Sequence, residues 1–470
     1  MEYSFWSYFK QICAIPRGSG NEAAVRTMIM DFAESKSISA VTDKAGNLLM
    51  KKKGSSGREY EPPVIIQGHL DMVCEKNGDT VHDFLKDPIV PVETGGWLHA
   101  RGTTLGADNG IAIAMAMALL VDTEASHPPL EVLCTVNEES GMNGAIGLEP
   151  GFFSAKRLIN LDSEEEGIFY IGCAGGIHTD CTVPVRREAW STDAEYLRCT
   201  VKGLKGGHSG MEIDKGLGNG IKLAGEVLSG YSGELRLLSL AGGDKHNAIP
   251  RECGCVIAVD SAENFSDHAR AMTAEFNKRF PEEPAVEVAV GTQEPAGTAL
   301  TEESTLRVIT FLTQVPHGPV TMDKNISGLV ESSTNMASVK LEDDKLRAVT
   351  SQRWSDPALM ERVTGMVAEA AAAAGGSAHN DSAYPPWKPN PDSALLKIAA
   401  DTYKRTVWKD PVITVVHAGL ECGVISEKFP DMDMISFGPD ITGAHSPDER
   451  VNIASAERVW GFLLELLKAL

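Results

Sequence analysis

Short apolar runs with the length of β-strands recur along the first third of the chain. They cover residues 40–43, 48–51, 64–67, 131–136 and 157–161. Several are bounded by Gly, Asn or Asp, which is typical of strands that end in turns.

Helical periodicity fills the spaces between these runs. Val25, Met28, Ile29 and Phe32 form an apolar stripe, for which Ser19 or Asn21 is the expected N-cap. Residues 108–121 form an alanine-rich apolar helix. Because strands and helices alternate, the pattern predicts βαβ units and a mostly parallel sheet.

The pattern changes after residue 172. Residues 176–183 and 195–201 alternate like half-exposed antiparallel strands, and they are interspersed with longer amphipathic helices at 217–228, 303–314 and 357–374. The proline-rich segment 385–391 interrupts this pattern. The helix–strand alternation then resumes, with a helix at 393–403, strands at 412–416 and 434–437, and a final helix carrying Val459, Phe462, Leu463, Leu466 and Leu467.

We therefore expect an α/β fold, in which a mostly parallel-sheet domain is interrupted by an inserted α+β lid domain. The predicted boundaries are 1–185 and 389–470 for the first domain and 186–388 for the insertion. Two domains also fit the length of 470 residues, since one hydrophobic core seldom grows that large.

Acidic and imidazole side chains follow several of the predicted strands. The run at 64–67 leads into His69 and Asp71, which point to the same face if the strand continues. Similar positions, just past an apolar run or in a glycine-rich turn, are held by Asp108, Glu138, Glu139, Asp162 and His445. Ligand sites of α/β sheets lie at such strand ends, although each residue alone could equally be a helix cap or a surface group.

Carboxylates and imidazoles without thiolates suit Zn²⁺, Co²⁺ or Mn²⁺. A carboxylate has two oxygens and can bridge a metal pair, which can hold a water molecule and lower its pKa. Glu138 and Glu139 are neighbours and point in opposite directions on an extended segment. One of them can therefore bind metal while the other takes the proton of the water.

Composition excludes several classes of partner. The formal net charge of −22 argues against nucleic acid and anionic membrane surfaces. The chain has neither a membrane-spanning apolar run nor a recognisable secretory signal. Nine scattered cysteines without a Cys-x-x-Cys pair indicate reduced thiols, so we expect a cytoplasmic protein.

Taken together, the motifs resemble those of the M20 metallopeptidase family. They are Gly68-His69-Leu70-Asp71, Gly106-Ala107-Asp108-Asn109-Gly110, Asn137-Glu138-Glu139, Gly206-Gly207-His208-Ser209-Gly210, His246-Asn247-Ala248-Ile249-Pro250, His417-Ala418-Gly419-Leu420-Glu421 and Gly443-Ala444-His445. Within the family, the order and context of these segments are similar to the aminoacyl-histidine dipeptidases, over essentially the whole chain.

The resemblance implies a dizinc site. His69 and Asp162 would bind one metal, and Glu139 and His445 the other. Asp108 would bridge them and be followed by a cis peptide bond. Glu138 would be the general base for attack by metal-bound hydroxide, and Asp71 would orient His69.

The resemblance also implies substrate contacts. His208 would stabilise the oxyanion, Asn247 would contact the scissile carbonyl, Arg353 would pair with the C-terminal carboxylate, and Glu421 would contact the free amino end. The expected substrate is an unblocked dipeptide, Xaa-His. An N-acyl-amino-acid deacylase, a tripeptidase and a catalytically silent binding protein remain alternatives, and a homodimer through the inserted domain remains as open as a monomer.

Overall fold

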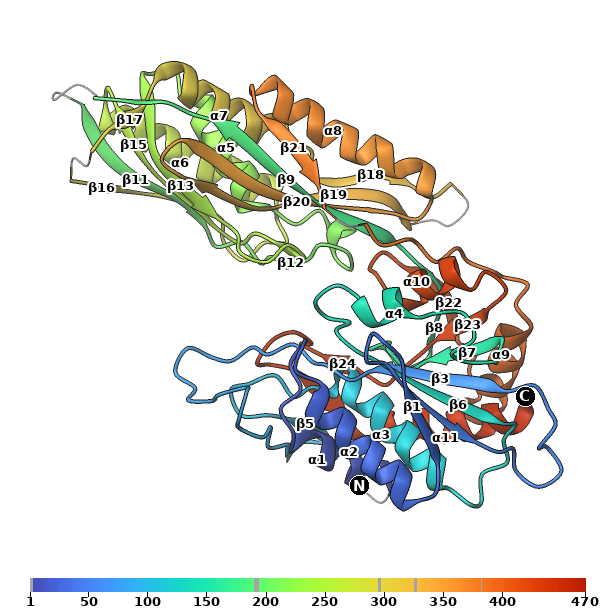
Figure 1. Ribbon diagram of the computed structural model, residues 1–470. Coiled ribbons are helices and arrows are strands. Elements are labelled where there is room, and N and C mark those ends of the chain that lie inside the picture. Colours follow the sequence, from blue (N-terminus) through green and yellow to red (C-terminus); the bar gives the residue numbers. More distant parts are fainter. Residues whose placement is uncertain (1–2, 190–193, 295–296, 325–327, 382) are drawn as a thin grey trace. The chain divides into compact units, whose positions relative to one another are not determined.

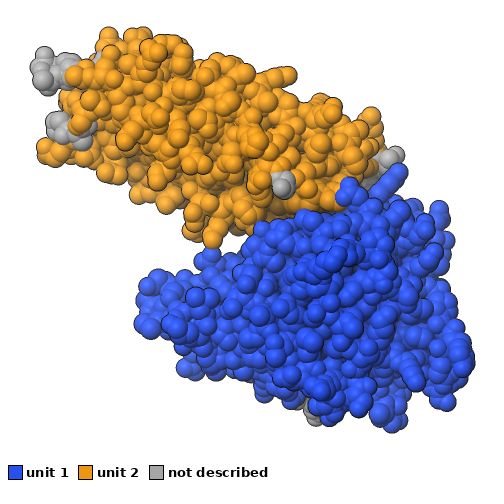
Figure 2. Space-filling view, in the orientation of Figure 1, with its two compact units in different colours: residues 1–173, 387–415, 420–470 blue, residues 174–386, 416–419 orange. Residues whose placement is uncertain are grey.

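The computed structural model describes residues 3–189, 194–294, 297–324, 328–381 and 383–470. The chain divides into two compact units, shown in separate colours in Figure 2. Unit 1 consists of residues 1–173, 387–415 and 420–470, and unit 2 of residues 174–386 and 416–419.

Unit 1 is built around an eight-stranded mixed sheet with the order β1-β2-β6-β3-β7-β23-β8-β22. Its four central strands are parallel: β6 (Leu130–Thr135), β3 (Val64–His69), β7 (Arg157–Asn160) and β23 (Asp433–Ser436). The flanking strands β1 (Ser39–Thr42), β2 (Leu48–Lys52) and β8 (Ile168–Cys173) pair in antiparallel fashion. Strand β22 (Val412–Val416) is at the edge (Figure 1). This arrangement confirms the α/β class, with the parallel pairing confined to the centre.

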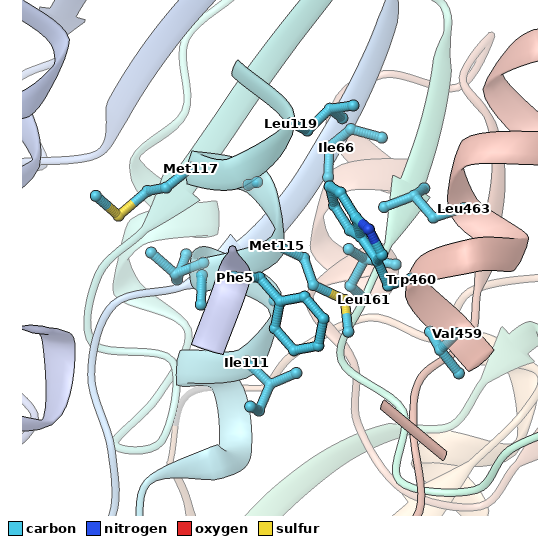
Figure 3. Close-up of a cluster of buried hydrophobic side chains, with 14 of the residues drawn as sticks. Phe5, Ile66, Ile111, Met115, Met117, Leu119, Leu161, Val459, Trp460 and Leu463 are labelled. Atoms are coloured by element: carbon cyan, nitrogen blue, oxygen red, sulfur yellow. The ribbon is translucent and has the colours of Figure 1, made fainter. Parts of the chain in front are cut away.

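The core of unit 1 is formed by this sheet and the helices packed against it, three of which contribute most of the buried helical side chains. These are α1 (Phe5–Cys13), α3 (Ala107–Val121) and α11 (Ile453–Ala469). Figure 3 shows Phe5, Ile66, Met115 and Trp460 from four different elements in one cluster. Helix α3 is apolar on all sides and almost entirely buried, as expected for a central helix. It anchors the ligand-bearing loop at its start.

Four further helices complete unit 1. They are α2 (Ala23–Ser35), α4 (Asn143–Gly147), α9 (Ala394–Val407) and α10 (Glu421–Lys428). A small four-stranded sheet adds β24 (Ile441–Thr442), β25 (Arg450–Asn452), β5 (Trp97–His99) and β4 (Val92–Thr94). Strands β24 and β25 flank the loop that carries His445.

Unit 2 is an antiparallel nine-stranded sheet covered by helices. The strand order is β16-β11-β15-β13-β19-β20-β9-β21, with β18 paired to β19. The bounds are β9 (Gly175–Pro184), β11 (Glu195–Lys202), β13 (Leu235–Gly242), β15 (Cys253–Val259), β16 (Glu287–Thr292), β18 (Gly318–Met322), β19 (Val330–Leu341), β20 (Lys345–Trp354) and β21 (Ser377–Asn380). The helices are α5 (Gly220–Gly230), α6 (Ala262–Arg279), α7 (Glu302–Gln314) and α8 (Met360–Ala373). They bury a second, separate apolar core.

Short elements complete unit 2. Two-stranded sheets pair β10 (Arg187–Glu188) with β17 (Ala299–Leu300), and β12 (Gly207–His208) with β14 (Ala248–Ile249). Single 3-10 turns lie at η1 (Ile213–Lys215) and η2 (Pro357–Leu359).

The predicted domain boundary after residue 185 is too late. Unit 2 begins at Ala174, because β9 pairs with β20 and β21 and therefore belongs to the second sheet. The return to unit 1 lies at Trp387, near the predicted position after 388. Residues 416–419 also belong to unit 2, which the sequence did not indicate.

The predicted helix cap at Ser19 or Asn21 is also wrong. Helix α2 begins at Ala23 with Glu22 at its N-cap position. The Ser19 hydroxyl instead donates a hydrogen bond to Oδ2 of Asp71, at 2.8 Å. No helix within the described ranges is long and apolar enough to cross a membrane.

Candidate metal centre

The candidate ligands gather where the central parallel strands of unit 1 end. Strand β3 ends at His69, the segment after β6 carries Glu138 and Glu139, and Asp162 follows β7. Since β3 lies between β6 and β7 and all three are parallel, their carboxyl ends open at the same edge of the sheet.

Asp108 lies between two imidazoles. Its Oδ1 is 3.0 Å from Nε2 of His69, and its Oδ2 is 3.2 Å from Nε2 of His445. Each carboxylate oxygen therefore faces a different histidine, which is the arrangement a bridging ligand requires. The peptide bond from Asp108 to Asn109 is cis, as expected from the resemblance.

The remaining ligands extend this arrangement on both sides. Oδ1 of Asp162 is 3.3 Å from Nε2 of His69, and Oε2 of Glu139 is 3.0 Å from Nε2 of His445. Donor atoms within 4.8 Å of one another form two groups that share Asp108: His69, Asp108 and Asp162, and Asp108, Glu139 and His445. A third group combines His69 with Glu138 and Glu139.

Burial and mutual charge alter the acidity of these groups. Burial, together with the charge of Glu139, raises the pKa of Glu138 well above its usual range. Burial and the charge of Asp108 raise the pKa of Glu139 to about 7. Burial raises the pKa of Asp162. So many carboxylates cannot all ionise together without a compensating cation.

The pKa values of the two imidazoles are raised as well, but by their acidic neighbours and against the effect of burial. Burial alone would lower the pKa of His445, but hydrogen bonds to Asp108 and Glu139 raise it to about 12. Asp162 and Asp108 likewise raise the pKa of His69 well above its usual range, against the effect of burial.

This donor set fits divalent metals. It consists of oxygen and imidazole nitrogen, and all nine cysteines lie elsewhere as free thiols. Oε1 of Glu139 is buried without a hydrogen-bond partner, so an acceptor remains available in the centre. The site thus has both the ligand types and the excess negative charge that a pair of divalent cations requires.

Asp71 connects the imidazole side of the centre to the Glu138–Glu139 turn. Its Oδ1 is 3.3 Å from Nδ1 of His69 and accepts the main-chain N–H of Glu138 at 3.0 Å. Its Oδ2 accepts the N–H of Glu139 at 3.1 Å. These hydrogen bonds offset the cost of burial, and the pKa of Asp71 falls to about 2.

Glu421 is fully buried at the start of α10. Its Oε2 accepts hydrogen bonds from Nε2 of Gln67 and the hydroxyl of Thr135, both at 2.6 Å. Its Oε1 is buried without a partner. Burial raises the pKa of Glu421 to about 7, although the bond from Thr135 opposes this.

The other three predicted substrate contacts lie on unit 2. His208 is in β12, opposite Ala248, and its Nδ1 accepts the N–H groups of Gly210 and Met211 at 3.2 and 3.0 Å. Asn247 is half-buried just before β14, and its carbonyl accepts the N–H of Ser209.

Arg353 is in β20 and is largely buried. Its Nη1 donates to the hydroxyl of Tyr384 at 2.9 Å, while its Nε has no partner. Burial and the charge of Arg353 lower the pKa of His417, to about 3. Burial and the charge of Arg353 also contribute to lowering the pKa of His178, to about 4. Arg353 is therefore a cation among neutral imidazoles.

Comparison with known proteins agrees with this centre. The sequence profile of Peptidase family M20/M25/M40 matches residues 65–469. The chain belongs to this family. It is accordingly a peptide-bond hydrolase of a metal-dependent type.

Two relatives of this M20 peptidase match almost its whole length. The cytosol non-specific dipeptidase of Escherichia coli (strain K12) is 42% identical over 98% of this chain and 96% of its own. The aminoacylhistidine dipeptidase of Vibrio alginolyticus has a structure that matches with a TM-score of 0.80 and 39% identity, over 99% of this chain and 96% of its own. A tripeptidase from Staphylococcus aureus, at 15% identity and a TM-score of 0.57 over 99% of this chain and 97% of its own, shares the fold.

Two buried residues of the peptidase beside the centre were not indicated by the sequence. Arg17 donates to the carbonyls of Leu70 and Asp71, and Glu449 accepts the main-chain N–H groups of Ala107 and Asp108. Both lie in polar segments that resemble ordinary surface loops. Since their partners are main-chain atoms, no side-chain pattern could have revealed them.

Proposed function

We propose that this M20 peptidase hydrolyses unblocked dipeptides and prefers histidine in the second position. The observation that carries the hydrolytic part is the position of Asp108, whose two oxygens face His69 and His445 and are shared by two ligand groups. The dipeptide part is supported by the Escherichia coli and Vibrio alginolyticus relatives, which are 42% and 39% identical to this chain and are both named dipeptidases.

In this proposal His69 and Asp162 would hold one metal ion, Glu139 and His445 would hold the other, and Asp108 would serve as a ligand to both. Zn²⁺ is the favoured ion and Co²⁺ or Mn²⁺ are alternatives, because the donors are carboxylate oxygen and imidazole nitrogen. When bound, the two ions would supply an acidified water molecule and polarise the scissile carbonyl.

Glu138 acts as the general base and then as the general acid. It takes a proton from the attacking water and delivers it to the leaving amine. Burial and the charge of Glu139 raise its pKa, which supports this role, because a carboxyl group of weakened acidity binds the transferred proton more readily than an exposed glutamate does. Asp71 orients His69 and fixes the main chain of Glu138.

His208 donates a hydrogen bond to the developing oxyanion. Because its Nδ1 already accepts two N–H groups, the neutral ring carries its proton on Nε2, which is the form a donor needs. Asn247 contacts the scissile carbonyl as a second polar group.

The two ends of the dipeptide are held by charge. Arg353 pairs with the C-terminal carboxylate, and its unpartnered Nε supports this assignment. Glu421 contacts the free amino end, supported by its unpartnered Oε1. Longer peptides lose one of these two anchors, which favours dipeptides.

We also propose that the enzyme works in the cytoplasm, as the name of its Escherichia coli relative suggests for that protein. The nine free cysteines are consistent with a reducing compartment. A homodimer formed through unit 2 remains a prediction, to be tested by the molar mass in solution.

The test is a matched panel on metal-reconstituted enzyme: Ala-His, β-Ala-His, Ala-Leu, N-acetyl-His and Ala-Ala-His. We expect fastest cleavage of the Xaa-His dipeptides and none by Glu138→Ala. Equal rates for Ala-His and Ala-Leu would remove the histidine preference and leave a non-specific dipeptidase. Preference for N-acetyl-His or Ala-Ala-His would instead indicate a deacylase or a tripeptidase.

A further inference from the structure

The loop that carries Asp108 is held by a buried carboxylate. Glu449 accepts four consecutive main-chain N–H groups: its Oε2 those of Leu105 and Gly106 at 2.7 and 2.9 Å, and its Oε1 those of Ala107 and Asp108 at 2.7 and 3.2 Å. The residue is only 2% exposed. A charged acceptor for four adjacent donors fixes this stretch of backbone more firmly than neutral hydrogen bonds would.

A buried guanidinium holds the same loop from its carbonyl side. Nη1 of Arg17 donates to the carbonyls of Leu70 and Asp71 at 2.9 and 2.7 Å, and Nη2 donates to the carbonyl of Gly106. Arg17 thereby connects the segment that follows His69 to the loop that precedes Asp108. The planar guanidinium presents its donors at fixed angles, which a lysine ammonium cannot reproduce.

Gly106 permits this close approach. A Cβ atom at this position would lie 2.5 Å from Nη2 of Arg17, and the φ angle of +70° disfavours any other residue. Backbone conformation, Arg17 and Glu449 therefore specify the same position of the loop.

We propose that Glu449 and Arg17 are positioning residues, which hold Asp108 at the spacing that both metal sites require. This inference rests on the proposed metal assignment. Asp108 belongs to the two ligand groups that make up the proposed metal sites, so a shift of its backbone changes both sites together. Neither positioning residue is itself a member of the ligand groups.

Glu131 offers a matched control. It is also a buried carboxylate of unit 1, and it accepts the N–H groups of Ser154 and Ala155, both at 2.9 Å, and a bond from Lys51. It lies near the start of β6, whereas Glu138 and Glu139 follow the end of that strand. Loss of its charge should affect stability and leave the metal centre unchanged.

The experiment compares wild type, Glu449→Gln and Glu131→Gln in the full chain. Glutamine keeps the size of the side chain, but its amide NH₂ faces two of the four N–H groups and cannot accept from them. We expect Glu449→Gln to weaken Co²⁺ or Zn²⁺ binding about 10- to 100-fold in chelator competition, the range typical of residues that orient ligands. The visible spectrum of the Co²⁺ form should change, and kcat should fall with little change in KM.

Wild-type affinity and spectrum in folded Glu449→Gln, or equal loss of affinity in Glu131→Gln, would overturn the positioning role. Failure of wild type to bind two ions would instead overturn the metal assignment on which the inference rests. If Glu449→Gln does not fold by circular dichroism, Arg17→Lys is measured in the same way, and unchanged binding there would equally overturn the inference.

Discussion

The carboxylate of Asp71 accepts the main-chain N–H of Glu138 at 3.0 Å, and the same oxygen is 3.3 Å from Nδ1 of His69. One buried side chain thus fixes both the proposed general base and a proposed metal ligand. This arrangement makes Asp71 sensitive even to an isosteric change.

We expect Asp71→Asn to lower kcat/KM for Ala-His about 10- to 100-fold. The carboxylate accepts hydrogen bonds through both oxygens, whereas the amide NH₂ of asparagine would face an N–H donor and could not accept from it. Asp43→Asn is the matched control, since Asp43 accepts the N–H groups of Gly46 and Asn47 in a turn of the same unit. Steady-state kinetics and metal content measure the effect. Equal activity of Asp71→Asn and Asp43→Asn would contradict it.

Glu138→Gln should lower kcat about 100- to 10,000-fold, because it removes the group that transfers the proton. Metal content by elemental analysis should stay at two ions per chain, since the two groups that share Asp108 do not include Glu138. Glu149→Gln, at an exposed ion pair with Lys44, should behave like wild type. Loss of metal from Glu138→Gln would show that Glu138 is a ligand.

Glu421 predicts a pH dependence of stability in the metal-free protein. Its pKa is raised to about 7 in the folded state, so between about pH 4.5 and 7 the folded chain holds a proton that the unfolded chain has released. Stability therefore falls as pH rises through this window. Relative to Glu421→Gln, we expect wild type to lose roughly 2–3 kcal/mol of unfolding free energy between pH 5 and 8.

Chemical denaturation of chelated protein at several pH values measures this difference. Glu131→Gln is the control, because hydrogen bonds from Lys51 and the main chain lower the pKa of Glu131 in spite of its burial. The contribution of the Glu131 carboxylate to the free energy of unfolding is therefore complete above about pH 5 and is lost only as the pH falls below that. A constant difference between wild type and Glu421→Gln from pH 5 to 8 would contradict the raised pKa.

Arg353→Lys should raise KM for Ala-His about 10- to 100-fold, because a single ammonium cannot replace the forked contact with a carboxylate. The substrate pair Ala-His and Ala-His-amide isolates the effect: wild type should prefer the free acid, and the variant should discriminate less. Arg347→Lys, exposed on the same strand, is the control. Unchanged discrimination in Arg353→Lys would remove Arg353 from carboxylate binding.

Hydrophobic patterning predicted the elements of unit 1 well where they are long or fully buried. The runs at 64–67, 131–136 and 157–161 correspond to β3, β6 and β7, and residues 108–121 to α3. The helix α1 was missed, although Phe5, Phe9 and Ile12 are buried on one side of it. In unit 2, the long helix α6 was missed as well, because its low content of apolar residues resembles that of a loop.

The candidate ligands could be selected from sequence because side chains carry that chemistry at strand ends. Which oxygen of Asp108 faces which imidazole could not be predicted, since it depends on a loop held by main-chain contacts to Arg17 and Glu449. The boundary near residue 185 failed for a related reason. Strand β9 is assigned to unit 2 by its pairing with β20, and pairing is not encoded in the strand itself.

The interrupted layout of unit 1 has a consequence for synthesis on the ribosome. Strand β8 is complete at residue 173, but its neighbours β22 and β23 lie at residues 412–416 and 433–436. All nine strands of the second sheet, by contrast, have been synthesised once residue 380 is translated. Unit 2 can therefore fold on the nascent chain before unit 1, although unit 1 begins earlier in the sequence. Under the proposed ligand assignment, His445 is made after every strand of the second sheet, so the metal site can be completed only after that sheet has been synthesised.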